Sequence, residues 1–413
     1  MRITAPTAAS CTRTRTTSPA TSTRISGRGY ACIKETQKKG QQPRHLAKNI
    51  KLLSVLVGAT PTAHNLQCRM KRYSKLYDKV ISLDNLQLAD TKARRGKARQ
   101  RGVKIFDRDR EGNLQRLHEI LKAEKFETSK YITFTVFEPK VRLIYRLPYF
   151  PDRITHHAIM NIVEPIWTRI FTHNTHSCLK NRGIAACAAQ VEQIIKNFEG
   201  RQLYCLKIDI KKYYPSIDNE ILKQIVRRKI KDGRLLKLID NIIDSERGLP
   251  IGNYLSQYLS NLYLAYFMHY CNEILKIECV EYADDMVYFS DNKDELHRVF
   301  NAIKDYLDSK LHLTIKSNYQ IFPIAENRQD RRGRALDYVG FKFYRHQKLI
   351  RKSIKQNFCR AVARLKKQNA TPEIIRRKTA SWYGWAKHSN SNHLLQKLFN
   401  YDKDILQPAA AGV

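Results

Sequence analysis

Two adjacent aspartates, Asp284 and Asp285, interrupt an otherwise apolar stretch of this 413-residue chain. The surrounding residues 280–289 are rich in aromatic and β-branched side chains, a composition that favours two short strands joined by a tight turn. Adjacent carboxylates repel each other and destabilise the fold unless a cation neutralises them. The pair therefore suggests a divalent-metal site on a rigid hairpin, although a solvated loop between strands would explain a bare Asp-Asp pair.

A third carboxylate, Asp209, makes the metal interpretation the stronger one. It follows residues 203–208, which have the composition of a buried strand. A carboxylate at the end of a strand, opposite a hairpin that carries two more, can hold two Mg²⁺ ions roughly 3.5–4 Å apart, as in-line phosphoryl transfer requires. Oxygen ligands and octahedral coordination, completed by substrate phosphates, favour magnesium.

The three carboxylates and the motifs around them resemble the palm of reverse transcriptases in order and spacing. Asp209 stands at the first palm carboxylate of that family, and Tyr282-Ala283-Asp284-Asp285 matches its signature box. Further matching segments are residues 153–160, 181–183, 248–257 and 337–341. The resemblance implies an α/β (α+β) right-hand polymerase fold, with fingers, an antiparallel palm sheet backed by helices, and a short helical thumb. It also implies an RNA-directed DNA polymerase that works with two Mg²⁺ ions.

The same resemblance implies roles for single residues. The metal ligands would be Asp209, Asp284, Asp285 and the backbone carbonyl of Ile210. Arg142 would grip the triphosphate of the incoming nucleotide, and Tyr214 would block a ribose 2′-hydroxyl, unless its ring is simply part of the core. The other nucleotide-binding positions would be Ile251, Gly252, Gln257 and Lys316. The family usually carries a Lys where this chain has Tyr319, and Lys316 is the nearest lysine that could replace it. The primer grip would be Val339, Gly340 and Phe341.

The middle motif indicates a subtype. Many family members carry Gln-Gly-x-x-x-Ser-Pro there, whereas this chain has Ile251 and Gln257 at the first and last positions. That variant, and residues 381–388, resemble the reverse transcriptases of diversity-generating retroelements. This resemblance implies mutagenic retrohoming: a template-repeat RNA is copied into cDNA with frequent errors opposite adenine, with the help of a small basic accessory protein. Ile251 offers only shape and apolar contact, which should loosen discrimination between nucleotides.

Three alternatives remain open at the sequence level. A group II intron-derived reverse transcriptase shares the same palm but usually extends into further regions. A retron or phage-defence reverse transcriptase is the second alternative. The third, from another class, is a non-catalytic RNA-binding scaffold with a vestigial palm.

Net charge agrees with a polyanionic partner. The chain carries 75 Lys and Arg against 38 Asp and Glu, a formal net charge of +37. Such a field attracts nucleic acid, here template RNA, a cDNA primer–template duplex and dNTPs. A ribosomal or histone-like protein would not need three acids within apolar strands. The apolar run 52–59 is too short to span a bilayer, so we expect a cytoplasmic, bacterial or phage-encoded protein without a membrane partner.

The chain divides into five expected regions. Residues 1–69 form a basic, disordered extension, with a transit peptide or an RNA-contacting arm as alternatives. Fingers and N-terminal helices follow over 70–205, the palm over 206–345, the thumb over 346–400 and a tail over 401–413. Within them we expect a template-contacting basic helix face at 92–101, an amphipathic helix at 113–121, a hairpin at 131–146 and a basic amphipathic helix at 353–368. His156 and His157 are expected on a helix surface or against the template.

Overall fold

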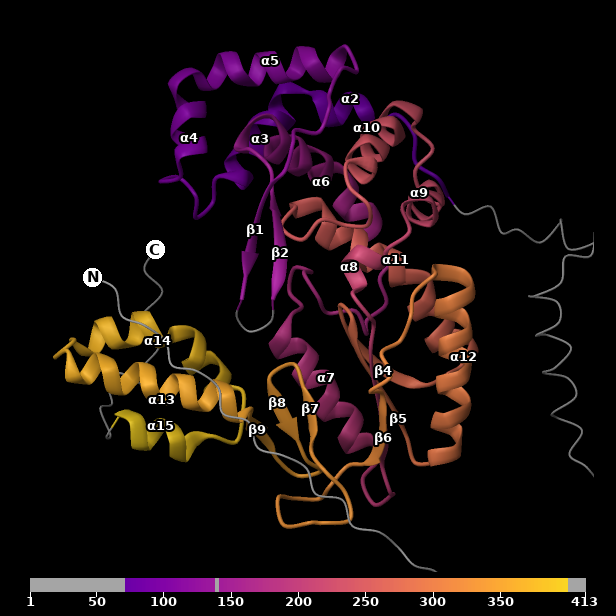
Figure 1. The fold of residues 1–413 in the computed structure, drawn as a ribbon, viewed down its shortest axis with the longest axis vertical. Coiled ribbons are helices and arrows are strands. Elements are labelled where there is room, and N and C mark those ends of the chain that lie inside the picture. Colours follow the sequence, from indigo (N-terminus) through magenta and orange to yellow (C-terminus); the bar gives the residue numbers. More distant parts are fainter. Residues whose placement is uncertain (1–70, 138–140, 400–413) are drawn as a thin grey trace, which may run out of the picture. The chain divides into compact units, whose positions relative to one another are not determined.

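The computed structural model describes residues 71–137 and 141–399, all within the unit Arg69–Val413. The expected N-terminal extension and C-terminal tail lie outside the described residues. The described part has four groups of elements: N-terminal helices, a two-stranded ribbon, a four-stranded sheet with its covering helices, and a three-stranded sheet followed by three helices (Figure 1). No helix within it is long and apolar enough to cross a membrane.

The N-terminal helices are α2 (Tyr77–Ile81), α3 (Leu83–Ala93), α4 (Arg101–Phe106) and α5 (Arg110–Lys122). Helices α2 and α3 pack on α6 (Ile154–Trp167), and α5 packs on α2 and α3. The predicted amphipathic helix is confirmed, because α5 buries Leu114, Leu117 and Leu121 on one face. The basic run 92–101 is not one continuous helix face: α3 ends at Ala93, α4 begins at Arg101, and turns fill the interval.

The prediction that His156 and His157 lie on a helix surface or against the template is wrong. His156 and His157 are buried, 2% and 5% exposed. Burial, reinforced by the nearby positive charge of Arg153, lowers the pKa of His156 to about 4 and that of His157 to about 3. The ring of His157 stacks on Tyr254 with centroids 4.0 Å apart. Both imidazoles are therefore neutral core side chains.

The ribbon consists of β1 (Ile132–Val136) and β2 (Arg142–Arg146), as the sequence predicts. The strands are antiparallel, and Val136 pairs with Arg142 at the end of the ribbon where the chain passes from β1 to β2. Several of its apolar side chains are exposed, including Ile132 at 66%. A two-stranded ribbon has no second layer of its own, so its position depends on contacts at its base.

The four-stranded sheet is antiparallel in the order β4-β5-β3-β6. Its strands are β3 (Tyr204–Asp209), β4 (Glu278–Tyr282), β5 (Asp285–Ser290) and β6 (Gln320–Pro323). Helices α7 (Ile184–Asn197) and α12 (Lys293–Leu311) pack on the sheet. The chain between β3 and β4 contains α8 (Tyr213–Ser216), α9 (Asn219–Arg227), α10 (Gly233–Asp244) and α11 (Tyr254–His269). Short helical turns lie at Asp107–Asp109, Tyr149–Arg153 and Tyr270–Ile274.

Alternating side chains of this sheet enter two different cores. Leu206 and Met286 belong to the large core that includes α11 and α12. Cys205 and Val287, the next residues on the same strands, pack on the other face with α7 and the three-stranded sheet. This period-two alternation covers both faces of the sheet and leaves its strand ends free to carry polar groups.

A three-stranded antiparallel sheet and three helices complete the described part. The strands are β7 (Leu336–Tyr338), β8 (Phe341–Phe343) and β9 (Lys348–Ile350), and the helices are α13 (Lys352–Lys367), α14 (Pro372–Lys387) and α15 (Asn392–Phe399). The predicted basic amphipathic helix is confirmed, because α13 buries Phe358, Val362 and Leu365 among basic residues. Trp385 of α14 lies on Phe341, with ring centroids 4.9 Å apart.

Candidate active site

The three predicted carboxylates come together at one end of the four-stranded sheet. Strands β3 and β5 pair so that Asp209 lies directly across from Asp285. Asp284 occupies the turn between β4 and β5, and its carbonyl accepts a hydrogen bond from the backbone N–H of Ile210 at 3.3 Å. The preceding residue, Ala283, has a left-handed φ of +56°, which keeps this turn tight. Residues far apart in the sequence thus form one acidic cluster.

The electrostatics of the cluster confirm that the carboxylates are close. Burial raises the pKa of Asp284, and the negative charge of Asp209 raises it further. Burial raises the pKa of Asp285 to about 6; Lys207 opposes the shift, while Asp209 and Asp284 add to it. The negative charge of Asp209 therefore opposes ionisation of Asp284 and Asp285, and nearby positive charge offsets this repulsion.

Two lysines provide positive charge at the cluster. Lys316 Nζ lies 2.6 Å from Asp209 Oδ2, and Lys207 Nζ lies 3.4 Å from Asp285 Oδ1. The backbone of Lys316 is tied to the same place, because its N–H donates to the Asp209 carbonyl at 2.9 Å. The sequence analysis singled out Lys316 but missed Lys207, which lies two residues before Asp209 on the same face of β3.

The oxygen atoms of the three carboxylates are suitable ligands for a hard cation. Asp209 Oδ1 and Asp285 Oδ1 are buried without a hydrogen-bond partner. The side-chain atoms of the three acids that could coordinate a metal ion are all carboxylate oxygens, the ligands that Mg²⁺ prefers. In the described ranges, no group of three or more His, Cys, Asp or Glu side chains has the arrangement to hold a metal ion. The oxygen atoms of the cluster thus suit magnesium. In this structure, however, Asp209 and Asp285 are paired with the ammonium groups of Lys316 and Lys207.

Tyr214 and Arg142 lie within electrostatic range of the cluster. Tyr214, in α8, is half-buried, and its hydroxyl accepts a hydrogen bond from Ser260 Oγ at 3.3 Å. Burial raises the pKa of Tyr214, and the charges of Asp284 and Arg142 also act on it. Arg142, on β2, lowers the pKa of Asp284. The neighbouring Tyr213 is the fully buried core aromatic of the pair.

Residues 251 and 252 of the middle motif contact strand β2 of the ribbon. The N–H of Tyr145 on β2 donates to the carbonyl of Ile251 at 2.8 Å. Gly252 has φ +125°, and a Cβ there would lie 2.3 Å from the Tyr145 carbonyl oxygen, so only glycine allows this approach. Ile251 is half-buried, whereas Gln257 is exposed on α11.

Val339, Gly340 and Phe341 form the turn between β7 and β8 and the first residue of β8. A Cβ on Gly340 would lie 2.3 Å from the Trp385 ring, so glycine allows the thumb helix α14 to approach this turn. The turn is also joined to the acidic cluster, because Tyr338 Oη donates to the Asp285 carbonyl at 2.9 Å. Lys207 Nζ adds a hydrogen bond of 2.7 Å to the Asp337 carbonyl.

Glu281 is a further polar residue that the sequence analysis missed. It lies in β4 directly before the Tyr282–Asp285 box and is fully buried. Its Oε2 accepts a hydrogen bond from Thr175 Oγ1 at 2.9 Å, and burial raises its pKa to about 8. Its backbone pairs with the segment beside it, through Asn174 and His176. An acid placed between Val280 and Tyr282, in the middle of an otherwise apolar stretch, was the signal that could have revealed it.

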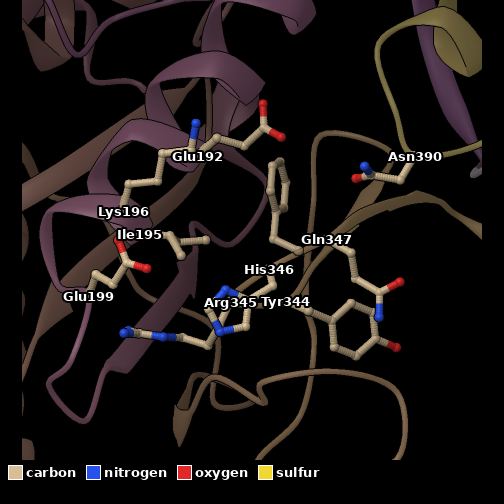
Figure 2. A pocket seen from close by; sticks show the side chains of 10 residues that line it. Glu192, Ile195, Lys196, Glu199, Tyr344, Arg345, His346, Gln347 and Asn390 are labelled. Atoms are coloured by element: carbon tan, nitrogen blue, oxygen red, sulfur yellow. The ribbon is translucent and has the colours of Figure 1, made fainter.

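A separate cavity lies away from the acidic cluster. Figure 2 shows a pocket of about 350 Å³ between α7 and the β8–β9 connection. Its lining residues are Glu192, Ile195, Lys196, Glu199, Phe343, Tyr344, Arg345, His346, Gln347 and Asn390. None of the sequence-predicted site residues is among them, so this pocket is not part of the candidate active site.

Residues 136–319 match the family model described as reverse transcriptase (RNA-dependent DNA polymerase). This segment is therefore similar to reverse transcriptase domains. The match contains Asp209, Asp284 and Asp285. The expected right-hand polymerase fold, with an antiparallel palm sheet backed by helices, is confirmed.

Individual relatives are distant. Protein YkfC of Escherichia coli is 27% identical over 139 residues, covering 31% of this chain and 36% of that protein. The group II intron-encoded protein LtrA of Lactococcus lactis is 27% identical over 129 residues, covering 29% of this chain and 21% of that protein. The chain thus spans about a third or less of these relatives' lengths. Apo telomerase from Candida tropicalis aligns with a TM-score of 0.45 and 11% identity, over 67% of this chain and 58% of that one.

We predict that the buried Glu281 makes stability depend on pH. Its folded pKa of about 8 exceeds the ordinary value of 4.5, so between these pH values the folded state holds more protons than the unfolded state. The free energy of unfolding should therefore fall as pH rises from 4.5 to 8, by up to about 1.4 kcal/mol per pH unit. Glu281→Gln should remove this part of the slope in urea unfolding measured at several pH values.

Glu199→Gln, at an exposed position, is the matched control and should keep the wild-type slope. Identical pH dependence in wild type and Glu281→Gln would show that the carboxyl is not held neutral in the fold.

Proposed function

We propose that this protein is an RNA-directed DNA polymerase that copies a template RNA into cDNA, with Asp209, Asp284 and Asp285 as its catalytic carboxylates. The observation that carries the proposal is the pairing of Asp209 with Asp285 across β3 and β5, with Asp284 in the adjoining turn, inside a segment similar to reverse transcriptase domains. In the reaction a primer 3′-hydroxyl attacks the α-phosphate of a dNTP and pyrophosphate leaves.

In this proposal the carboxylates hold two Mg²⁺ ions, with the Ile210 carbonyl as a further ligand. When bound, these ions supply the charge that activates the hydroxyl and stabilises the transferring phosphoryl group. Lys316 and Lys207, which contact Asp209 and Asp285, keep the acids together before substrate arrives. In this proposal Lys316, which lies beside Asp209, also meets the leaving pyrophosphate. Catalysis then rests on positioning and on charge stabilisation.

The nucleotide would lie between the ribbon and the palm. Arg142 on β2, which acts electrostatically on Asp284, neutralises the triphosphate. Ile251 and Gly252, which seat β2 through Tyr145, shape the space for the new base pair, and Gln257 borders it from α11. Val339, Gly340 and Phe341, joined to Asp285 through Tyr338, place the primer end.

We predict that Asp284→Asn abolishes polymerisation. Loss of one carboxylate charge removes a cation ligand, and primer extension with Mg²⁺ should fall on the order of 10²–10³-fold. Asp308→Asn, which removes one exposed acid from α12, should extend primers as wild type does. Full activity of Asp284→Asn would exclude Asp284 as a catalytic carboxylate, whereas a wild type that extends no primer would favour the scaffold alternative, an RNA-binding protein without catalysis.

We predict that Tyr214 selects deoxyribonucleotides. The ring lies beside the acidic cluster, so its removal should leave room for a 2′-hydroxyl. Tyr214→Val should reduce the preference for dNTP over rNTP on the order of 100-fold in single-nucleotide incorporation. Tyr214→Phe keeps the ring while losing the Ser260 contact and should retain the preference. Unchanged selectivity in Tyr214→Val would assign the ring to the core.

For the biological role, we propose error-prone copying in a diversity-generating retroelement, with a small basic accessory protein. The support is the Ile251 and Gln257 variant of the middle motif. The similarity to a group II intron-encoded protein favours a second candidate, an intron-derived enzyme.

We predict that Ile251→Gln lowers misincorporation opposite template adenine. A Gln side chain can hydrogen-bond the nucleotide and leaves polar groups unpaired with a wrong partner, so errors should fall on the order of tenfold. Sequencing of cDNA made by wild type, Ile251→Gln and Ile251→Leu measures this, and Ile251→Leu should keep the wild-type error rate. Equal error rates in all three would exclude Ile251 as a cause of low fidelity and favour the intron-derived candidate.

A further inference from the structure

A loop rich in arginine connects β6 to the residues before β7. Residues 326–332, here named the arginine loop, read Glu-Asn-Arg-Gln-Asp-Arg-Arg. Arg328, Arg331 and Arg332 are all exposed, and the Arg332 side chain is 86% exposed. Within the described part of the chain, Arg328 and Arg331 make no ion pair. The loop thus presents unneutralised guanidinium groups to solvent.

The arginine loop is held in one conformation by its own polar groups. Asp330 accepts hydrogen bonds of 3.0 Å from the N–H groups of Glu326 and Arg332. Asn327 Oδ1 accepts from the N–H of Gln329 at 2.9 Å and of Asp330 at 3.2 Å. The one aspartate of the loop is therefore engaged inside it and is not available to neutralise Arg328 or Arg331.

The base of the loop is equally fixed. The N–H of Ala325 donates to the Arg334 carbonyl at 3.1 Å, and that of Arg334 donates to the Pro323 carbonyl at 3.0 Å. A Cβ on Gly333 would lie 2.7 Å from the Pro323 carbonyl oxygen, so the chain crosses here by close backbone contact. A cation that is already ordered loses less conformational entropy when it binds a ligand.

The arginine loop lies at the end of the palm sheet away from the carboxylates. Pro323, the last residue of β6, pairs with Tyr204, the first residue of β3, whereas Asp209 ends that strand. At about 3.3 Å per residue, the length of β3 separates the two ends by roughly 17 Å. Figure 1 shows the β6–β7 connection at the lower edge, away from α8, which follows Asp209. A nucleotide bound at Asp209 cannot also contact the arginine loop.

The chemistry of the loop favours RNA over an acidic protein. Guanidinium groups match the phosphate group in shape and can donate two hydrogen bonds to it. Protein interfaces are built around apolar and aromatic anchors, and the arginine loop contains no apolar side chain. A rigid, arginine-rich and wholly polar loop suits a sugar–phosphate backbone, which is recognised by charge and shape.

We propose that the arginine loop is a second RNA-binding surface, which holds the backbone of the template RNA outside the catalytic centre. It rests on the proposed function in that the RNA is the template to be copied. Such a surface adds affinity for a long, structured RNA and none for a short primer–template that occupies the catalytic end alone.

The test compares two double variants of the full chain that remove the same charge. Arg328→Gln with Arg331→Gln neutralises the loop, while Arg332 is left in place because its Nε donates to Asp330 at 3.1 Å. Arg116→Gln with Lys122→Gln removes two exposed cations from α5. Binding of a long structured RNA is measured by fluorescence anisotropy over a series of salt concentrations, and extension of a short primer–template is measured on the same preparations.

The loop variant should bind the long RNA on the order of tenfold more weakly, and its slope of log affinity against log salt should fall by about 2. The α5 variant should show neither change, and both should extend the short primer–template as wild type does. Equal weakening in the two variants, or none in the loop variant, would overturn the proposal even where primer extension succeeds. Absence of extension in wild type would instead count against the proposed function alone.

Competition experiments distinguish RNA from two other possible ligands of the loop, an acidic protein and a small anion. Free phosphate and poly-glutamate should each show the same inhibition constant, corrected for RNA affinity, with wild type and with the loop variant. If poly-glutamate competes more strongly with wild type than with the loop variant, the partner of the loop is an acidic protein and not RNA. If free phosphate does so, the loop is a site for small anions only.

Discussion

Mutual repulsion among Asp209, Asp284 and Asp285 is the constraint on which the rest of the palm depends. The antiparallel pairing of β3 and β5 forces two of these acids to face each other, and the tight turn at Ala283 adds the third. Burial makes the repulsion more costly because it removes the screening that water provides. The raised pKa values of Asp284 and Asp285 record that cost, and Lys316 and Lys207 offset part of it. An arrangement this unfavourable in isolation makes physical sense where cations are to be bound.

The elements around the cluster are attached to it by short polar links, not only by apolar packing. The ribbon is joined to Ile251 through a backbone hydrogen bond from Tyr145, and β7 is joined to β5 through Tyr338. Behind the turn, Glu281 holds the segment of Thr175 against β4. Each link fixes a predicted substrate-contacting element relative to the carboxylates, which is what a reaction that depends on positioning requires.

Sequence reasoning predicted the parts of this site that rest on local pattern. The strand before Asp209, the Tyr282–Asp285 hairpin, the ribbon and the amphipathic helices α5 and α13 all follow from the period of apolar residues and from turn chemistry. The partners of Asp209 and Asp285 could not be predicted in the same way, because register across a sheet decides which lysine meets which acid. His156 and His157 were misplaced because a polar residue in an apolar helix can face water or lie buried in neutral form. The interruption of the basic run 92–101 reflects tertiary packing that composition does not encode. The retroelement subtype, which rests on two positions of one motif, stays a prediction.

The central claim is that the three acids converge on bound cations. Crystals of the protein soaked with Mn²⁺ in place of Mg²⁺, with data collected at the manganese absorption edge, test it directly. We expect anomalous density between the side chains of Asp209, Asp284 and Asp285, with Lys316 Nζ moved away from Asp209. Absence of that density, with Lys316 still seated on Asp209 in the presence of Mn²⁺ and a dNTP, would contradict the account.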